Sequence, residues 1–431
     1  IKRTNSSEPH AIYDSVRGIN KQLESNSNGQ EATNTSPNEG VNAFNTNGFT
    51  TGNNGGTNRS PNFYAAWCWK GGGEPTATNS QSSGAMTANS VSIDGVLQSA
   101  YTPSGTPDIY PKKMSINTQA GFSIVHYQNA GSASQRVPHG LGAAPKVCII
   151  KKFSTSGAWH WHTTAIDGSF DDLILNDTSG KTNLSLTAFD SNTFAAESGA
   201  TGQDMIAYCF DDTVQSGAFQ KFGSYTGNGS AIGDIVETGF EPAFLLIKQA
   251  STSGNNWVIY DNKRELVNSR FKYLSPNTSD SEGSNDASNY PRVNFLSNGF
   301  QIAGTDGRVN TNTETYLYWA IAADPSTAST PVVTNAFDVV RWTGTGSNTD
   351  ILADTSPDLV WGKRSDNAIG DTNHFWFDSI RGVESRLMSN SNLGETVISD
   401  EVTAFNEKGF SVGVDPSTNG SGAEMVAFLW S

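Results

Sequence analysis

The chain repeats one pattern of short aromatic strands along most of its 431 residues, and this repetition constrains the fold more than any other feature. Three copies are complete, at residues 120–213, 217–324 and 336–431, and residues 1–70 carry only the second part of the same pattern. In chain order, these segments are copy 1 (1–70), copy 2 (120–213), copy 3 (217–324) and copy 4 (336–431). Each complete copy is long enough to be a domain of its own.

Copy 3 illustrates the repeated pattern. An aromatic strand, Phe219–Tyr225, leads to a buried-looking strand that ends in lysine, Phe244–Lys248. A second aromatic strand and the pair Asn298-Gly299 follow, and Tyr318–Ile321 closes the copy by alternating small and large side chains. Asn-Gly is a strong hairpin signal because both residues tolerate positive φ angles. Six or more short strands per copy predict an all-β fold of antiparallel, jelly-roll-like β-sandwiches in tandem.

Two segments separate the copies. Residues 71–119 are rich in glycine, serine and proline and are predicted to be a linker, with a possible edge strand at Val91–Val96. A shorter boundary is expected at residues 325–334. Copy 1 lacks its opening strands, which leaves three explanations: missing upstream sequence, a strand from residues 71–119, or a strand from a neighbouring subunit. We favour missing sequence, because the break falls within a strand at Ile1-Lys2. One short helix is expected at Val383–Met388.

Composition narrows the classes of partner. The chain has 27 Lys and Arg against 42 Asp and Glu, a formal net charge of −15. This balance opposes binding to nucleic acid or to an anionic membrane, and no apolar run approaches the ~20 residues of a spanning helix. Cys68, Cys148 and Cys209 show no disulfide or metal spacing and align with apolar or small residues of other copies. We expect them to be unpaired core residues.

Candidate metal and catalytic residues are few. His160 and His162 share one face of a strand and could begin a metal site. However, His162 aligns with Tyr13, Tyr260 and Phe377, and no third ligand is recognisable, so a packing role is favoured. No nucleophile, phosphate-loop, metalloprotease or EF-hand motif is found. The sequence therefore predicts no enzyme, no cofactor and no metal.

Aspartate and arginine recur three residues apart after the second aromatic strand in three copies: Asp14 and Arg17, Asp261 and Arg264, Asp378 and Arg381. Such a pair can fix a loop through bidentate hydrogen bonds. A structural corner is favoured over a ligand site, because recognition residues rarely recur in every module. A lysine also recurs at the end of the buried strand, at Lys2, Lys151, Lys248 and Lys363.

Aromatic residues on loops that do not recur between copies are the candidates for surface recognition. A flat aromatic ring can stack on the apolar face of a sugar, and Tyr101, Tyr110 and Tyr290 are the predicted residues.

Several motifs carry a resemblance to a known family. These are Y-D-S-V-R-G (Tyr13–Gly18), F-D-S-I-R-G (Phe377–Gly382), A-W-C-W-K (Ala66–Lys70) and G-F-S-I-V-H-Y (Gly121–Tyr127). The chain resembles a repeat domain in tail-fibre-like proteins of marine bacteriophages, including cyanophages. The resemblance implies an extracellular virion protein that assembles with itself, as a trimer, and with other virion proteins, and that attaches to host-surface glycans. It brings no catalytic residues. Copy 2 departs from the pattern, since it lacks the D-S-x-R-G element and has Thr193 where glycine is expected.

The expected function is therefore that of a phage tail fibre or appendage built from rigid modules. Three alternatives remain open: a head or tail decoration protein, a bacterial surface adhesin or filament subunit, and a polysaccharide depolymerase. A depolymerase would need an acidic cleft in one copy that its siblings lack.

Overall fold

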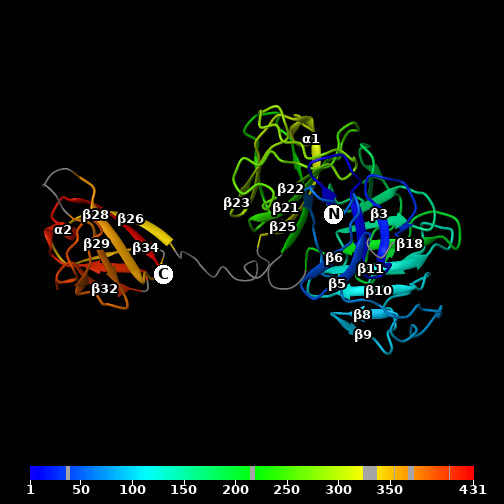
Figure 1. Cartoon of the computed structure of the whole chain (residues 1–431), viewed down its shortest axis with the longest axis horizontal. Helices are drawn as coiled ribbons and strands as arrows, with labels where there is room; N and C mark the ends of the chain where they lie inside the picture. The colour runs from blue at the N-terminus through cyan, green and yellow to red at the C-terminus, as the bar shows by residue number, and fades with distance from the viewer. Residues whose placement is uncertain (35–38, 214–218, 324–336, 354, 367–372, 407) are drawn as a thin grey trace. The chain divides into compact units, whose positions relative to one another are not determined.

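The computed structural model describes residues 1–34, 39–213, 219–323, 337–353, 355–366, 373–406 and 408–431. The chain divides into two compact units, residues 1–330 and 331–431, so that copies 1 to 3 form the first unit and copy 4 the second (Figure 1). The predicted boundary at residues 325–334 and the adjoining ends of copies 3 and 4 lie outside the described residues.

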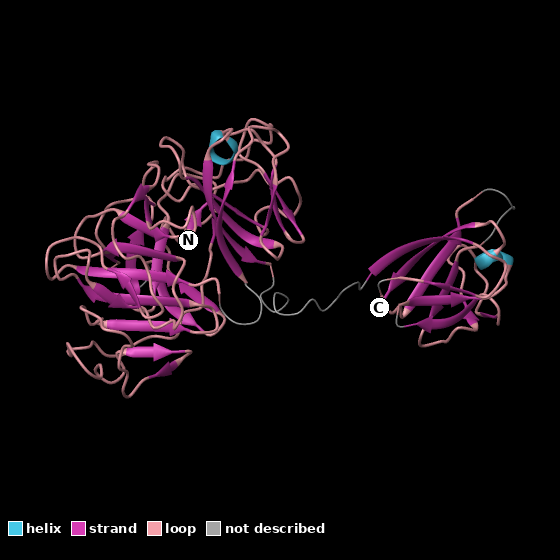
Figure 2. Cartoon of the chain, turned by 180° about the vertical axis from the view of Figure 1, so that it is seen from behind, coloured by secondary structure: helices cyan, strands magenta, loops and turns pink. Residues whose placement is uncertain are grey.

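The described elements are almost all strands, which confirms the predicted all-β class (Figure 2). The two described helices are single turns, α1 (Gly307–Asn310) and α2 (Pro416–Asn419), and each follows an aspartate whose carboxylate accepts a backbone N–H of the first turn. The helix expected at Val383–Met388 is wrong, because this stretch holds β30 (Ser385–Arg386), which pairs with β31 (Thr396–Val397). In the described part of the chain, no helix has the length and apolar character to cross a membrane.

Copy 3 is a sandwich of two antiparallel sheets. The larger sheet has the order β19 (Gln220–Thr226), β25 (Thr315–Ala322), β21 (Pro242–Gln249), β22 (Val258–Asp261). The smaller sheet has the order β20 (Ile235–Glu237), β24 (Gly299–Ile302), β23 (Val293–Leu296). Leu245 and Tyr318 of the larger sheet are buried with Phe295 and Phe300 of the smaller one, so the core lies between the sheets.

Copy 4 has the same strand order. Its larger sheet is β26 (Phe337–Thr343), β34 (Glu424–Trp430), β28 (Leu359–Arg364), β29 (Phe375–Asp378). Its smaller sheet is β27 (Thr349–Ile351), β33 (Gly409–Val412), β32 (Val402–Asn406). The register also agrees, since Phe300 pairs with Val236 in copy 3 and Phe410 pairs with Ile351 in copy 4. The repeats read from the sequence are therefore repeats of structure.

Copy 2 has a larger sheet of the same kind, with additional strands at both edges. The shared strands are β11 (Phe122–Gln128), β18 (Asp204–Phe210), β13 (Val147–Lys152) and β14 (Trp159–Thr163), and the smaller sheet is β12 (Arg136–Pro138) with β17 (Thr193–Ala195). Beyond β14 the sheet continues with β15 (Asp171–Ile174) and β16 (Thr182–Asn183). Beyond β11 it continues with β10 (Lys113–Asn117), β8 (Val91–Ile93) and β9 (Val96–Leu97), which gives a nine-stranded sheet.

Residues 71–119 are therefore not a linker. Strand β10 pairs with β11, and β8 runs parallel to β10, so this segment belongs to the sheet of copy 2. Its apolar side chains Met114 and Ile116 are fully buried in the core of that copy. The strand expected at Val91–Val96 is present, but it is split into β8 and β9, and β9 forms the edge.

Copy 1 consists of short paired strands. β1 (Lys2–Arg3) pairs with β7 (Tyr64–Ala65), and β5 (Val41–Asn45) pairs with β6 (Gly48–Thr51). β3 (Gly18–Glu24) lies between β2 (Ala11–Asp14) and β4 (Ala32–Thr33) and pairs with both. The closing strand expected at Ala66–Trp69 is wrong, because β7 ends at Ala65. Trp69 instead stacks on Trp319 of copy 3, with ring centroids 5.4 Å apart.

Candidate functional site

Copies 1, 2 and 3 bury one face of their sheets in a shared apolar core. Trp161 of copy 2 lies 5.1 Å from Trp257 of copy 3, measured between ring centroids. Trp319 of copy 3 lies 4.7 Å from Phe210 of copy 2. Val16 of copy 1 is buried in the same cluster. Close aromatic packing of this kind supplies large buried areas, and the three copies form one compact unit instead of three separate domains.

The recurrent lysines cross the boundaries between these copies. Three fully buried lysine amines each donate to a backbone carbonyl of another copy: Lys2 to Ser279 (3.3 Å), Lys151 to Asn28 (3.1 Å) and Lys248 to Thr178 (3.3 Å). Copy 2 thus contacts copy 1, copy 3 contacts copy 2, and copy 1 contacts copy 3. The contacts close into a ring, called here the three-copy ring. Burial lowers the pKa of each of these amines to about 8.

Indole groups follow the same direction around the three-copy ring. The Trp159 Nε1–H donates to the carbonyl of Glu24 at 2.8 Å, and the Trp257 Nε1–H donates to the carbonyl of Ile174 at 3.2 Å. The two donors occupy equivalent positions in copies 2 and 3, and the two acceptors occupy equivalent positions in copies 1 and 2. The junctions are therefore repeated structures, like the copies themselves.

The predicted Asp–Arg corners form in all three copies that have them. In copy 3, Asp261 accepts the backbone N–H of Arg264 at 2.8 Å and its Nε–H at 2.7 Å. The same guanidinium donates to the carbonyl of Ile259 and pairs with Glu282 at 2.7 Å. Arg17 and Arg381 make the equivalent pairs, with Asp14 and Glu31 and with Asp378 and Glu395. Each arginine is engaged in fixing its loop, and the glutamates were missed because they lie outside the local motif.

Two of these corners also bind a neighbouring copy. The Tyr208 hydroxyl of copy 2 donates to Asp14 of copy 1 at 2.7 Å, and the Trp67 indole of copy 1 donates to Asp261 of copy 3 at 3.1 Å. Trp319 of copy 3 occupies the equivalent donor position, but copy 2 has no aspartate at its corner. The Trp319 Nε1 is accordingly buried without a hydrogen-bond partner among the described residues.

In copy 4 no described residue of the same unit covers the equivalent sheet face. Phe337 and Val339 are 48% and 46% exposed. Six more apolar residues of this face are only half-buried: Leu359, Trp361, Trp376, Val426, Phe428 and Trp430. Their equivalents in copies 2 and 3, such as Trp161 and Trp319, are 1% and 3% exposed in the shared core. We call these eight residues of copy 4 the free face.

The predicted surface tyrosines are all partly buried. Tyr101 and Tyr110 are half-buried and pack against the core of copy 2, and burial raises the pKa of Tyr101. Tyr101 lines a pocket of about 170 Å³ with Pro138 and Asn192, among others. Tyr290 is half-buried in copy 3. Tyr101 and Tyr110 therefore belong to the core surroundings of copy 2, and Tyr290 to copy 3.

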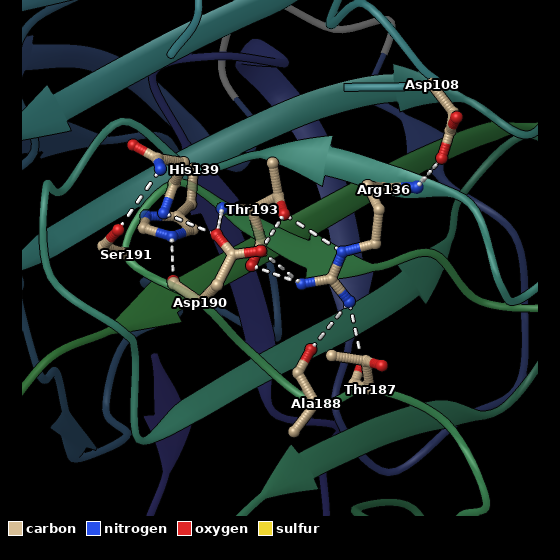
Figure 3. A network of polar contacts seen from close by, with 9 residues as sticks. Asp108, Arg136, His139, Thr187, Ala188, Asp190, Ser191 and Thr193 are labelled. Carbon is tan, nitrogen blue, oxygen red and sulfur yellow. Dashed lines mark hydrogen bonds and ion pairs between the residues drawn. The ribbon is translucent and has the colours of Figure 1, made fainter. Parts of the chain in front are cut away.

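A polar network beside that pocket replaces the glycine turn that copy 2 lacks (Figure 3). Arg136 on β12 donates to the Thr193 hydroxyl at 3.0 Å, to the Asp190 carboxylate at 3.1 Å and to the carbonyls of Thr187 and Ala188. Every side-chain nitrogen of this arginine has an acceptor, so the network fixes the loop before β17. Burial lowers the pKa of the adjacent His139 to about 4.

A cleft of about 510 Å³ lies where copy 1 meets copy 3. Phe63 and Tyr64 of copy 1 line it together with Arg264, Lys272 and Glu282 of copy 3, and the Phe63 side chain is 70% exposed. Sequence reasoning missed this cleft because it needs the contact between copies. The sequence does contain one indication of this cleft, because Phe63 is apolar whereas the equivalent residues of the other copies are polar.

The structure also brings His160 and His162 together with two carboxylates. Asp172 on β15 and Glu197 after β17 lie within 4 Å of the imidazoles. Burial disfavours the charged forms of His160 and Glu197, but the contacts between the imidazoles and the carboxylates have the larger effect on both pKa values. They raise the pKa of His160 through Asp172 and Glu197 and lower the pKa of Glu197 to about 2 through both histidines. These residue types can hold a divalent cation. The expectation that His162 is only a packing residue overlooked both carboxylates.

A search of curated proteins returned no match for the chain. The sequence profile of one family, described as a domain of unknown function (DUF7483), matches residues 1–107, 96–325 and 333–431. The three matches cover nearly the whole chain and include all four copies. The chain belongs to the DUF7483 family.

Proposed function

We propose that this chain is a structural protein of an extracellular fibre, the tail fibre or another appendage of a phage virion, and that copy 4 joins three chains into a trimer. The free face of copy 4 is the observation that carries the proposal. Large contiguous apolar patches are uncommon on monomeric proteins and mark interaction surfaces.

The occupant of the free face is inferred from the siblings of copy 4. In copies 1, 2 and 3 the equivalent faces cover one another, and three copies are needed before the ring of contacts closes. The three-copy ring is already closed by copies 1, 2 and 3, so it has no position for copy 4. Copy 4 contributes one such face per chain, so three chains supply the faces of a second ring.

Polar positions in copy 4 support the same assembly. Lys363 stands at the position of the lysines that donate across the junctions of the three-copy ring. Asn392 stands at the position of Asn28, whose carbonyl accepts from Lys151. Copy 4 therefore carries a donor and an acceptor in the places that a junction between identical chains requires.

The mass of the assembly in solution tests this proposal. Light scattering of the purified full chain, 45.9 kDa as a monomer, is expected to give three times that mass. Phe428→Glu places a charge on the free face, where the side chain is half-exposed and the monomer can tolerate it, and is expected to give monomers. Ile380→Glu is the matched control, because Ile380 is 95% exposed in copy 4 and is not part of the free face.

A monomeric wild type, or a Phe428→Glu variant that keeps the mass of the wild type, would contradict the trimer. Attachment to host-surface glycans is the second part of the proposal, and the cleft with the exposed Phe63 ring supports it. Sugar binding without shortening of the polysaccharide is the outcome expected of an attachment protein. Shortening would favour the depolymerase alternative, and binding along bacterial filaments would favour the adhesin.

A further inference from the structure

Four potential metal ligands meet in copy 2, independently of the assembly face. His160 and His162 come from β14, Asp172 from β15 and Glu197 from the segment after β17. β14 and β15 belong to the larger sheet of this sandwich and β17 to the smaller one. The four side chains therefore converge from both sheets, although Glu197 lies 35 residues after His162 in sequence.

One ligand atom from each of His160, His162 and Asp172 lies within 4.8 Å of the others, and Glu197 contacts both imidazoles. The Nδ1 of His160 is 2.9 Å from Asp172 Oδ2 and 3.5 Å from Glu197 Oε2. The Nε2 of His162 is 3.8 Å from Asp172 Oδ1 and 3.2 Å from Glu197 Oε2. A tetrahedral site with bonds of about 2.0–2.2 Å has ligand atoms about 3.3–3.6 Å apart, and the four imidazole–carboxylate separations bracket this value.

Unpaired buried atoms give a second, independent reason for a ligand. The His162 side chain is 2% exposed, its Nδ1 has no hydrogen-bond partner among the described residues, and its Nε2 faces the carboxylates of Glu197 and Asp172. Asp172 Oδ1 is also buried and accepts no hydrogen bond from the residues that the structure describes. Buried polar atoms without partners are costly and point to a missing ion or other group. Two carboxylates and two neutral imidazoles also supply the charge that balances a divalent ion.

The sibling copies provide an internal comparison. The positions of His160, His162 and Glu197 are occupied in copy 3 by Val258, Tyr260 and Ala303. In copy 4 they are occupied by Phe375, Phe377 and Gly413. The larger side chains at these positions belong to the apolar core of their copies. Copy 2 has exchanged this part of its core for ligand-type residues at all of these positions together.

We propose that His160, His162, Asp172 and Glu197 form a structural site for one divalent transition-metal ion of the zinc type. Imidazole nitrogen and carboxylate oxygen together suit such ions, and four protein ligands leave no open position for a substrate. The ion would join the larger sheet of copy 2 to the end of its smaller sheet.

Zinc binding to the full chain tests the proposal. After treatment with a chelator, calorimetric titration with Zn²⁺ is expected to give one ion per chain and a higher melting temperature. Substituting Co²⁺ is expected to give the visible absorption bands of a four-coordinate ion. His162→Gln removes one ligand and is expected to weaken Zn²⁺ binding by at least about 100-fold, more than an outer-shell change costs.

Two further variants keep the test decisive. The double variant His160→Val/His162→Tyr carries the residues of copy 3, and is expected to fold without binding Zn²⁺. His126→Gln is the matched control, since His126 pairs with a single carboxylate, Asp204 at 3.1 Å, and should bind as the wild type does. The proposal is overturned if the wild type takes up no Zn²⁺ or Co²⁺, or if the double variant binds Zn²⁺ as tightly as the wild type.

Discussion

We expect the three-copy ring to be more stable in mildly alkaline solution than at neutral pH, because the amine of Lys248 is buried. This amine is fully buried and donates to the carbonyls of Thr178 and Gln249. Burial lowers its pKa from 10.5 to about 8, and the nearby charge of Asp177 acts in the opposite direction. The native protein therefore releases this proton at a lower pH than the unfolded chain does.

The sign and size of the effect follow from proton linkage. Between about pH 8 and pH 10.5 the unfolded chain binds the proton that the native protein has lost, so the free energy of unfolding rises with pH. With these two pKa values, the gain between about pH 7 and pH 9 is roughly 1 kcal/mol from Lys248 alone. Below about pH 7 the amine is charged in both states, and the full cost of burying the charge is present.

The Lys248→Met variant isolates this contribution. Urea denaturation of both proteins at about pH 7 and pH 9 should show a smaller gain for the variant, by roughly 1 kcal/mol. Copy 4 and the other lysines are the same in both proteins, so their contributions cancel. An NMR titration of the Lys248 side chain reports the pKa directly. Equal pH dependence in the two proteins, or titration near the ordinary lysine value, would refute the reasoning.

Three further outcomes are expected. Tyr208→Phe removes the hydroxyl that donates to Asp14 and should cost about 1.5–3 kcal/mol of unfolding free energy. Tyr260→Phe removes a buried hydroxyl that has no hydrogen-bond partner among the described residues and should cost far less, so equal losses in urea denaturation would contradict this. Burial raises the pKa of Glu401 in copy 4 to about 7, so copy 4 should lose stability as the pH rises from about 4.5 to 7, and Glu401→Gln should flatten that change in thermal melts at several pH values. Phe63→Ala should weaken binding to host polysaccharide on a glycan array by about tenfold without changing the mass of the assembly, and unchanged binding would place the sugar site elsewhere.

Local patterns in the sequence predicted local structure well. Asn298-Gly299 marked a hairpin, and the three-residue spacing of Asp261 and Arg264 marked a hydrogen-bonded corner. Both features depend only on neighbouring residues, so their chemistry is visible in a short window. The all-β class followed from many such windows in a row.

Features that depend on distant residues were not predictable in the same way. β10 has only five residues and no clear alternation of polar and apolar side chains, and its burial follows from pairing with β11. Glu197 joins the histidine cluster only because the two sheets of copy 2 face each other. The lysine positions were visible as a recurrent column, but their acceptors lie on other copies and have no shared sequence motif.

Because its copies are covalently linked, the three-copy ring is independent of protein concentration in a way that a trimer of separate chains is not. Linked copies stay at a high effective concentration however dilute the protein is, so their contacts persist at concentrations where separate chains would part. Each linked copy also meets only its own two neighbours, and one copy can diverge without disturbing an identical partner. Copy 2 differs from its neighbours in this way, since it has other side chains in place of the Asp–Arg corner and of part of the apolar core. In the proposed trimer, by contrast, a substitution in the free face of copy 4 would occur in all three chains at once.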